Sequence, residues 1–114
     1  MMNANRRRGE IAAELDGRVR KLCLTLGALA ELEAAYAADD LGALVARFSR
    51  GSLSALDLVR IIAAGLRGAG EDVSEEAVRS MQVEDGATGF AKIAAELLAA
   101  TFGGQGAERA TPNP

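Results

Sequence analysis

The sequence predicts an α+β fold that is mostly α, with an N-terminal β-hairpin followed by four or five short helices in one compact domain. Two strand-like segments flank an Asp-Gly dipeptide near the N-terminus, which is typical of a hairpin. Apolar residues recur at helical spacing in the segments that follow. The chain has 114 residues, which is enough for one domain with a single core.

Residues 10–15 and 18–24 are predicted to be the two strands of the hairpin. The Asp-Gly dipeptide between them tolerates the positive φ angles of a two-residue type I′ turn. This turn fixes the register, in which Leu15 faces Arg18, and it sorts the side chains onto two faces. We expect one face to be buried against helices: Ile11, Ala13, Leu15, Leu22 and Leu24. On the other face, Lys21 between two glutamates is expected to form an ion cluster.

Helices are predicted where apolar residues recur every three or four positions. The segments are residues 26–37, residues 41–48, the segment 52–68, a short helix within 68–81, and residues 90–102 after the loop QVEDGAT. The expected N-caps are Thr25, Asp39 or Asp40, Ser54 with Asp57 near a capping box, and Ser74. Gly51 and Gly103 are expected to end two of the helices. In the first helix, Leu29, Leu32 and Tyr36 are expected on a common side, with Leu26 and Ala28 supporting them.

We divide the chain into a flexible basic N-terminus (residues 1–8), one domain (9–102) and a disordered tail (103–114). Residues 1–21 carry six basic and three acidic side chains, and the remainder carries seven basic and thirteen acidic ones. An acidic body is poorly suited to phosphate backbones, so nucleic acid is not an expected partner. Arg6, Arg7 and Arg8 are interpreted as a solvated terminus.

Catalytic and metal chemistry are not expected. The chain has no histidine, its single cysteine cannot supply a zinc site, and its glycines form no phosphate-binding motif. We therefore predict no catalytic residues, no metal, no cofactor and no enzymatic activity. Cys23 lies alone, which is typical of a reducing compartment, and we interpret it as a packed apolar residue. No apolar run is long enough for a membrane span and no signal peptide is recognised, so the predicted location is the cytoplasm.

Several short motifs carry a resemblance to a known family. They are R-R-R-G-E (6–10), L-D-G-R (15–18), L-x-L-T-L-G-A-L-A-E-L-E (22–33), L-S-A-L-D-L (53–58) and G-L-R-G-A-G (65–70). Together, over about residues 5–102, the chain resembles the small tail protein of the gene transfer agent family. Gene transfer agents are phage-like particles that bacteria make from chromosomal gene clusters.

The resemblance implies a tail assembly chaperone, which would bind the tape measure protein and help the tail tube protein to polymerise around it. A first alternative is a structural tail tube component that stays in the particle. We rank it second because tube subunits are typically β-rich, whereas strands are predicted here only at residues 10–24. A second alternative is a small nucleic-acid-binding regulator that uses the basic N-terminus. Homo-oligomerisation is left open.

Four apolar residues near predicted helix ends are the candidates for partner binding. They are Phe48, Leu53, Leu56 and Phe102. Placement near a helix end, rather than in the middle of an apolar stripe, leaves such side chains available to a partner helix. The alternative is that all four are ordinary residues of the core or its rim.

Overall fold

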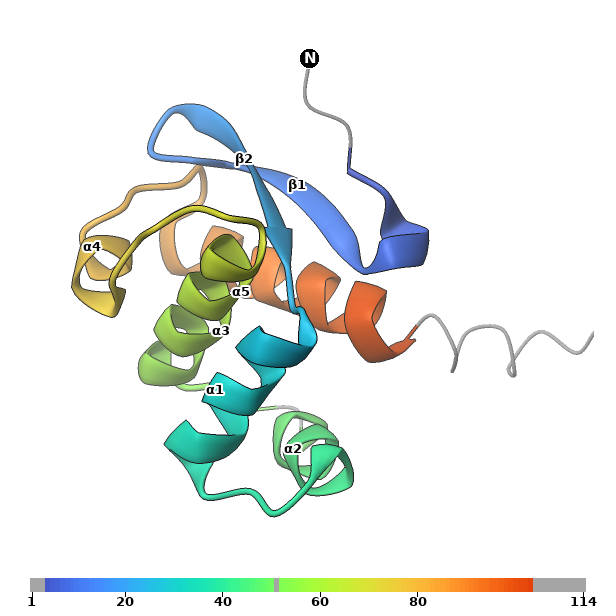
Figure 1. Ribbon diagram of the computed structural model, residues 1–114. Coiled ribbons are helices and arrows are strands. Elements are labelled where there is room, and N and C mark those ends of the chain that lie inside the picture. Colours follow the sequence, from blue (N-terminus) through green and yellow to red (C-terminus); the bar gives the residue numbers. More distant parts are fainter. Residues whose placement is uncertain (1–3, 51, 104–114) are drawn as a thin grey trace, which may run out of the picture.

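The computed structural model describes residues 4–50 and 52–103 of the chain. Its elements are, in order, a 3-10 turn η1 (Arg6–Arg8), strands β1 (Glu10–Leu15) and β2 (Arg18–Cys23), helices α1 (Leu26–Tyr36), α2 (Leu41–Phe48), α3 (Ala55–Gly68), α4 (Glu75–Arg79) and α5 (Gly86–Leu98), and a π-helical turn η2 (Ala99–Gly103). The hairpin lies across α3 and α5, and α1 leads away from it toward α2 (Figure 1). The predicted fold class is confirmed.

The hairpin has the predicted turn and register. Asp16 and Gly17 have φ angles of 59° and 80°, and Leu15 pairs with Arg18. The predicted core face is buried at four positions, and Ala13 is half-buried. On the other face, the Lys21 ammonium lies 3.8 Å from Glu10, one of the two glutamates expected in the ion cluster.

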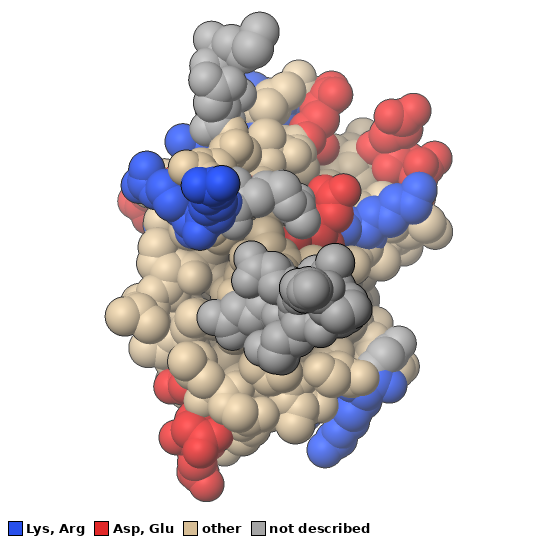
Figure 2. Space-filling view, turned by 90° about the vertical axis from the view of Figure 1, so that its right-hand side faces the viewer, with Lys and Arg blue, Asp and Glu red and all other residues tan. Residues whose placement is uncertain are grey.

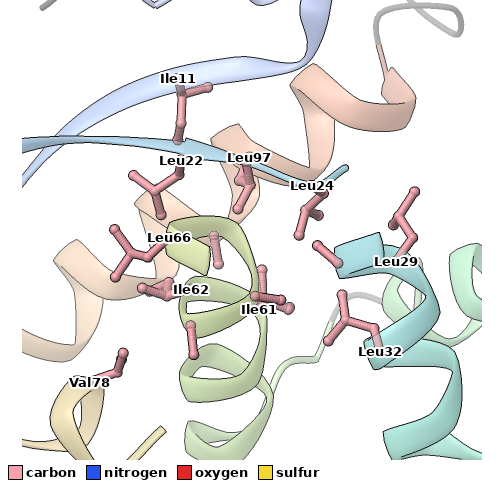
Figure 3. Packing of buried hydrophobic residues seen from close by; sticks show 14 of the residues in the cluster. Ile11, Leu22, Leu24, Leu29, Leu32, Ile61, Ile62, Leu66, Val78 and Leu97 are labelled. Carbon is pink, nitrogen blue, oxygen red and sulfur yellow. The ribbon is translucent and has the colours of Figure 1, made fainter. Parts of the chain in front are cut away.

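Helix α3 is the centre of the core, with every side chain from Ile61 to Leu66 buried. It packs against β2, α1, α4 and α5. Figure 3 shows side chains of these elements pointing toward it, among them Leu22 from β2, Val78 from α4 and Leu97 from α5. The wide apolar arc of this segment therefore reflects burial on several sides.

The predicted N-cap residues cap the first turns of α1 to α4. Thr25 Oγ1 accepts a hydrogen bond from the Ala28 amide at 3.1 Å, and Asp40, the second of the two candidate aspartates, caps α2. Ser54 and Asp57 form a full capping box, in which each side chain accepts from the other residue's main-chain amide. Four of the five helices therefore begin where local sequence rules place them.

Two details of the helix predictions are wrong. Leu26 is 79% exposed, because it lies about 200° around α1 from the buried Ala28 and so faces away from α3. Helix α5 begins at Gly86, four residues before the predicted start. A Cβ on Gly89 would lie 2.0 Å from the Glu84 carbonyl oxygen, so the absence of a side chain lets this first turn pack on the preceding loop. That local contact outweighs the poor helix propensity of glycine.

Both ends of the described chain meet beside the hairpin. The 3-10 turn η1 follows Asn5, whose main-chain oxygen accepts from the Glu10 amide at 3.0 Å, and η1 packs against η2. The predicted end of α2 at Gly51 lies outside the described residues, as do residues 104–114 of the predicted tail (103–114). Gly103, the first residue of that tail, is the last residue of η2. None of the helices in the described ranges is long and apolar enough to cross a membrane.

Candidate functional site

Two of the four predicted partner-binding residues line one surface groove. We call it the phenylalanine groove; it has a volume of about 190 Å³. Its lining is Val45, Phe48, Ser49, Leu98, Ala99, Phe102 and Gly103. Phe48 comes from the end of α2 and is 8% exposed, whereas Phe102 comes from η2 and is half-buried. The fold thus brings together two aromatic side chains that are far apart in the sequence.

Phe48 is positioned by Tyr36 at the end of α1. The two rings meet edge to face, with centroids 5.4 Å apart and planes at 89°. The guanidinium groups of Arg47 and Arg60 lie 4.2 and 5.1 Å from the Tyr36 ring centroid. The Tyr36 hydroxyl donates a hydrogen bond to Asp57 on α3. This cluster ties α2, and with it the wall of the groove, to α1 and α3.

The environment of this cluster shifts the pKa of both acidic groups in it. Burial raises the pKa of Asp57, but hydrogen bonds from Tyr36 and Ser54 and the charge of Arg47 outweigh burial, so the net pKa lies below its usual value. Burial, followed by the hydrogen bond to Asp57, raises the pKa of Tyr36. Asp57 is therefore a charged, fully bonded structural residue at neutral pH rather than a proton donor.

The other two predicted residues lie elsewhere. Leu53 is half-buried against the core just before α3, and Leu56 is 39% exposed on the first turn of α3. Neither lines the phenylalanine groove. The four candidates thus divide between two places on the surface, and their role in partner binding stays a prediction.

A second apolar groove was not predicted. It lies between α3, α4 and the start of α5 and has a volume of about 170 Å³. Its lining is Ala55, Leu58, Val59, Val78, Arg79, Ala87 and Phe90. Leu58 and Val59 lie at the edge of the apolar arc of α3 and are half-buried, and their place in that arc is the signal that could have indicated this groove.

A third groove, which we call the acidic groove, runs between β1, the loop before α5 and the outer side of α5. It has a volume of about 610 Å³. Four carboxylates and one ammonium line it, from Glu14, Glu84, Asp85, Glu96 and Lys92. Sequence reasoning missed this groove because its charges come from three segments that only the fold brings together.

Several arginines of the described residues are paired with carboxylates. Arg18 and Arg20 both pair with Glu71, and Arg67 binds Glu31 at 2.7 Å. On the face shown in Figure 2, Lys and Arg side chains lie in separate places. The described residues on this face form no continuous row of cations, on which a nucleic-acid-binding surface depends.

Cys23 and the acidic side chains show no sign of a reactive or metal site. Burial, followed by the charge of Glu10, raises the pKa of the half-buried Cys23 thiol, which lies 3.6 Å from the Arg8 carbonyl oxygen. Within residues 4–50 and 52–103, no three His, Cys, Asp or Glu side chains are grouped so that they could hold a metal ion.

The comparison with protein families decides the relationship. A family described as "Phage tail tube protein, GTA-gp10" matches residues 8–104, which include the hairpin and all five helices. The chain belongs to this family. The resemblance to gene transfer agent tail proteins is confirmed, and a role connected with the tail follows. The family description favours the structural tube component over the assembly chaperone that we ranked first from the sequence. Curated proteins and solved structures gave no match.

Proposed function

We propose that the protein is a structural component of the tail tube of a phage-like gene transfer particle. The observation that carries this proposal is the tail tube family match over residues 8–104, which spans nearly the whole described domain. The matched range contains the residues of the core as well as the residues that line the surface grooves.

The surface of the fold is compatible with repeated subunit contacts. A tube places each copy against several neighbours, so each copy needs more than one contact surface. The phenylalanine groove and the α3–α4–α5 groove are two separate apolar surfaces of similar volume. Leu56 and Leu41 add exposed apolar side chains at the starts of α3 and α2. Surfaces of this kind are typical of association sites.

A second candidate function is the assembly chaperone that binds the tape measure protein. The observation that favours it is the low strand content, since the sheet formed by the described residues has two strands. Tube subunits are typically sandwiches or barrels whose strands join between subunits. Apolar grooves beside helices instead suit a partner that presents an amphipathic helix.

Quantitative mass spectrometry of purified particles separates the two functions. A tube component is retained at a stoichiometry comparable to the other repeated tail proteins. An assembly chaperone is absent or present at a small fraction of that level. Particles that contain no trace of the protein would overturn the proposal of a tube component. Co-expression with the tape measure protein then tests the second candidate: the tape measure protein should be soluble only when this protein is present.

The predicted contact residues can be tested in the same system. Leu56→Ser and Phe102→Ser each remove apolar surface at one of the two places. Leu26→Ser is the matched control, because Leu26 is exposed on α1 and lines neither apolar groove. We expect the first two variants to lose incorporation into particles, or tape measure binding, while they remain folded by circular dichroism. If Leu26→Ser behaves like the other two, the loss reflects general surface polarity and the four-residue prediction fails.

A further inference from the structure

The free edge of β1 has main-chain groups that no part of the described chain binds. In a hairpin with a two-residue turn, the residues that flank the turn form a hydrogen-bonded pair, and such pairs alternate along the strand. Leu15 and Ala13 therefore direct their main-chain groups toward β2. Ala12 and Glu14, which lie between these positions, direct theirs away from it.

Main-chain hydrogen bonds at both ends of β1 confirm this orientation. The Glu10 amide donates outward to the Asn5 oxygen at 3.0 Å, and the Asp16 amide donates outward to the Gln82 oxygen at 2.7 Å. Between these two bonds, the amides of Ala12 and Glu14 have no acceptor among residues 4–50 and 52–103. The outward amides at the two ends of β1 are thus hydrogen-bonded, and those in the middle of the strand are not.

The acidic groove lies directly alongside this open part of the edge. Ala12, Ala13 and Glu14 form one wall, and Lys92, Ile93 and Glu96 of α5 contribute to the other. The rim at Gln82 is fixed to the hairpin turn, because its amide also donates to the Asp16 carboxylate at 3.3 Å. An exposed strand edge is a template for pairing with another chain, and here a groove of about 610 Å³ leaves room for one.

The charge of the groove selects the kind of segment that fits. Glu14, Glu84, Asp85 and Glu96 surround the open edge, with Lys92 as the one cation in the lining. A second copy that paired through the same edge would bring its own Glu14 and the same carboxylates against these, and like charges across a strand pair are destabilising. A segment with arginine or lysine side chains instead gains charge-assisted hydrogen bonds.

We propose that the acidic groove binds an extended basic segment of a partner protein, which adds to the sheet as a third strand beside β1. Its main chain pairs with Ala12 and Glu14, and its basic side chains contact the carboxylates of the loop and α5. The open length of β1 accommodates three or four residues of the partner, since each pairing position uses two residues of an antiparallel strand. Binding of such a segment can be measured on the isolated protein, so its test does not depend on the proposed function.

The probe is the synthetic heptapeptide acetyl-Thr-Arg-Val-Arg-Val-Arg-Thr-amide, titrated into ¹⁵N-labelled protein and followed by NMR. We expect the largest shifts at the amides of Ala12, Glu14, Lys92 and Glu96, and weaker binding as salt rises. Two control peptides separate the contributions. One carries glutamate at the arginine positions, and the other has both valines N-methylated so that two main-chain donors are lost; both should bind more weakly.

Protein variants give the sharper test. Ala12→Pro removes the outward amide of β1 and leaves the bonds to β2, and proline is tolerated at such edge positions. We expect at least about fivefold weaker peptide binding, the effect of one lost hydrogen bond. Val19→Pro is the matched control, because Val19 is exposed and directs its amide to the opposite edge, on β2. Should Ala12→Pro fail to fold, the double substitution Glu84→Gln and Glu96→Gln provides the same comparison through charge.

Three outcomes would overturn the proposal. The first is equal binding of the peptide to the wild type and to the variants of the acidic groove. The second is a set of shifts centred on the phenylalanine groove or on the β2 edge. The third is a concentration-dependent shift of Ala12 and Glu14 without peptide, because a second copy would then occupy the edge.

Discussion

The end of α3 lies so close to the β2–α1 connection that a single methyl group at Gly68 should destabilise the fold. A Cβ at this position would lie 1.9 Å from the Cys23 carbonyl oxygen, 3.1 Å from its carbon and 3.4 Å from the Thr25 nitrogen. All three atoms belong to the main chain, so no side chain can rotate aside. Relief requires a shift of the helix end or the strand by more than about 1 Å, and overpacking of this kind costs about 1–3 kcal/mol.

Because the clash is with main-chain atoms, the cost of Gly68→Ala should lie at the upper end of this range, about 3 kcal/mol. The better helix propensity of alanine offsets about 1 kcal/mol, so the free energy of unfolding should fall by about 2 kcal/mol. The matched control is Gly27→Ala in α1, where the nearest atom to the new Cβ is Thr25 Oγ1 at 3.8 Å. That variant should be stabilised by about 0.4–1 kcal/mol.

Urea unfolding followed by circular dichroism measures both variants. With an m-value of about 1.5 kcal/mol/M, the midpoint of Gly68→Ala falls by about 1.3 M and that of Gly27→Ala rises by about 0.5 M. A midpoint for Gly68→Ala at or above that of the wild type would refute the close approach of α3 to the β2–α1 connection.

The other predictions concern single side chains. Asp57→Asn should lose about 1–2 kcal/mol of stability at pH 7. The pKa of Asp57 is lowered in the folded state, so the wild type keeps this contribution above about pH 4 and loses it as pH falls through the folded pKa. Between about pH 5 and 2, the urea midpoint of the variant should therefore depend less on pH than the midpoint of the wild type. Cys23 should react with iodoacetamide more slowly in the native protein than in urea at pH 8, as measured by mass spectrometry, because its pKa is raised. Leu26→Lys should leave the melting temperature nearly unchanged, whereas Leu29→Lys, at a buried position, should unfold the protein.

Elements specified by neighbouring residues were predictable from the sequence. The type I′ turn at Asp16 fixes the hairpin register, and each side chain of β1 and β2 then follows by alternation. Ser54 and Asp57 are three residues apart and form their capping box without help from the rest of the fold. Local rules such as these depend on the main-chain angles of only a few neighbouring residues, so they can be applied to a single sequence.

Features that depend on the packing of distant segments were not predictable in this way. Phe48 and Phe102 were each chosen for their place at a helix end, but their meeting in one groove depends on how α2 lies against the end of α5. The acidic groove likewise combines Glu14 with carboxylates about seventy and eighty residues later in the chain.

The central position of α3 has a consequence for the order in which the protein can acquire its fold during synthesis. The hairpin is complete at Cys23, but α3, the first of the two helices that cover its apolar face, ends at Gly68. At about 5–20 residues per second, the ribosome needs roughly 2–9 s to make the residues between these points. An isolated two-stranded hairpin is marginally stable in water. During this interval Ile11, Leu15 and Leu22 have no stable structure to bury them, so their apolar side chains are exposed on the nascent chain.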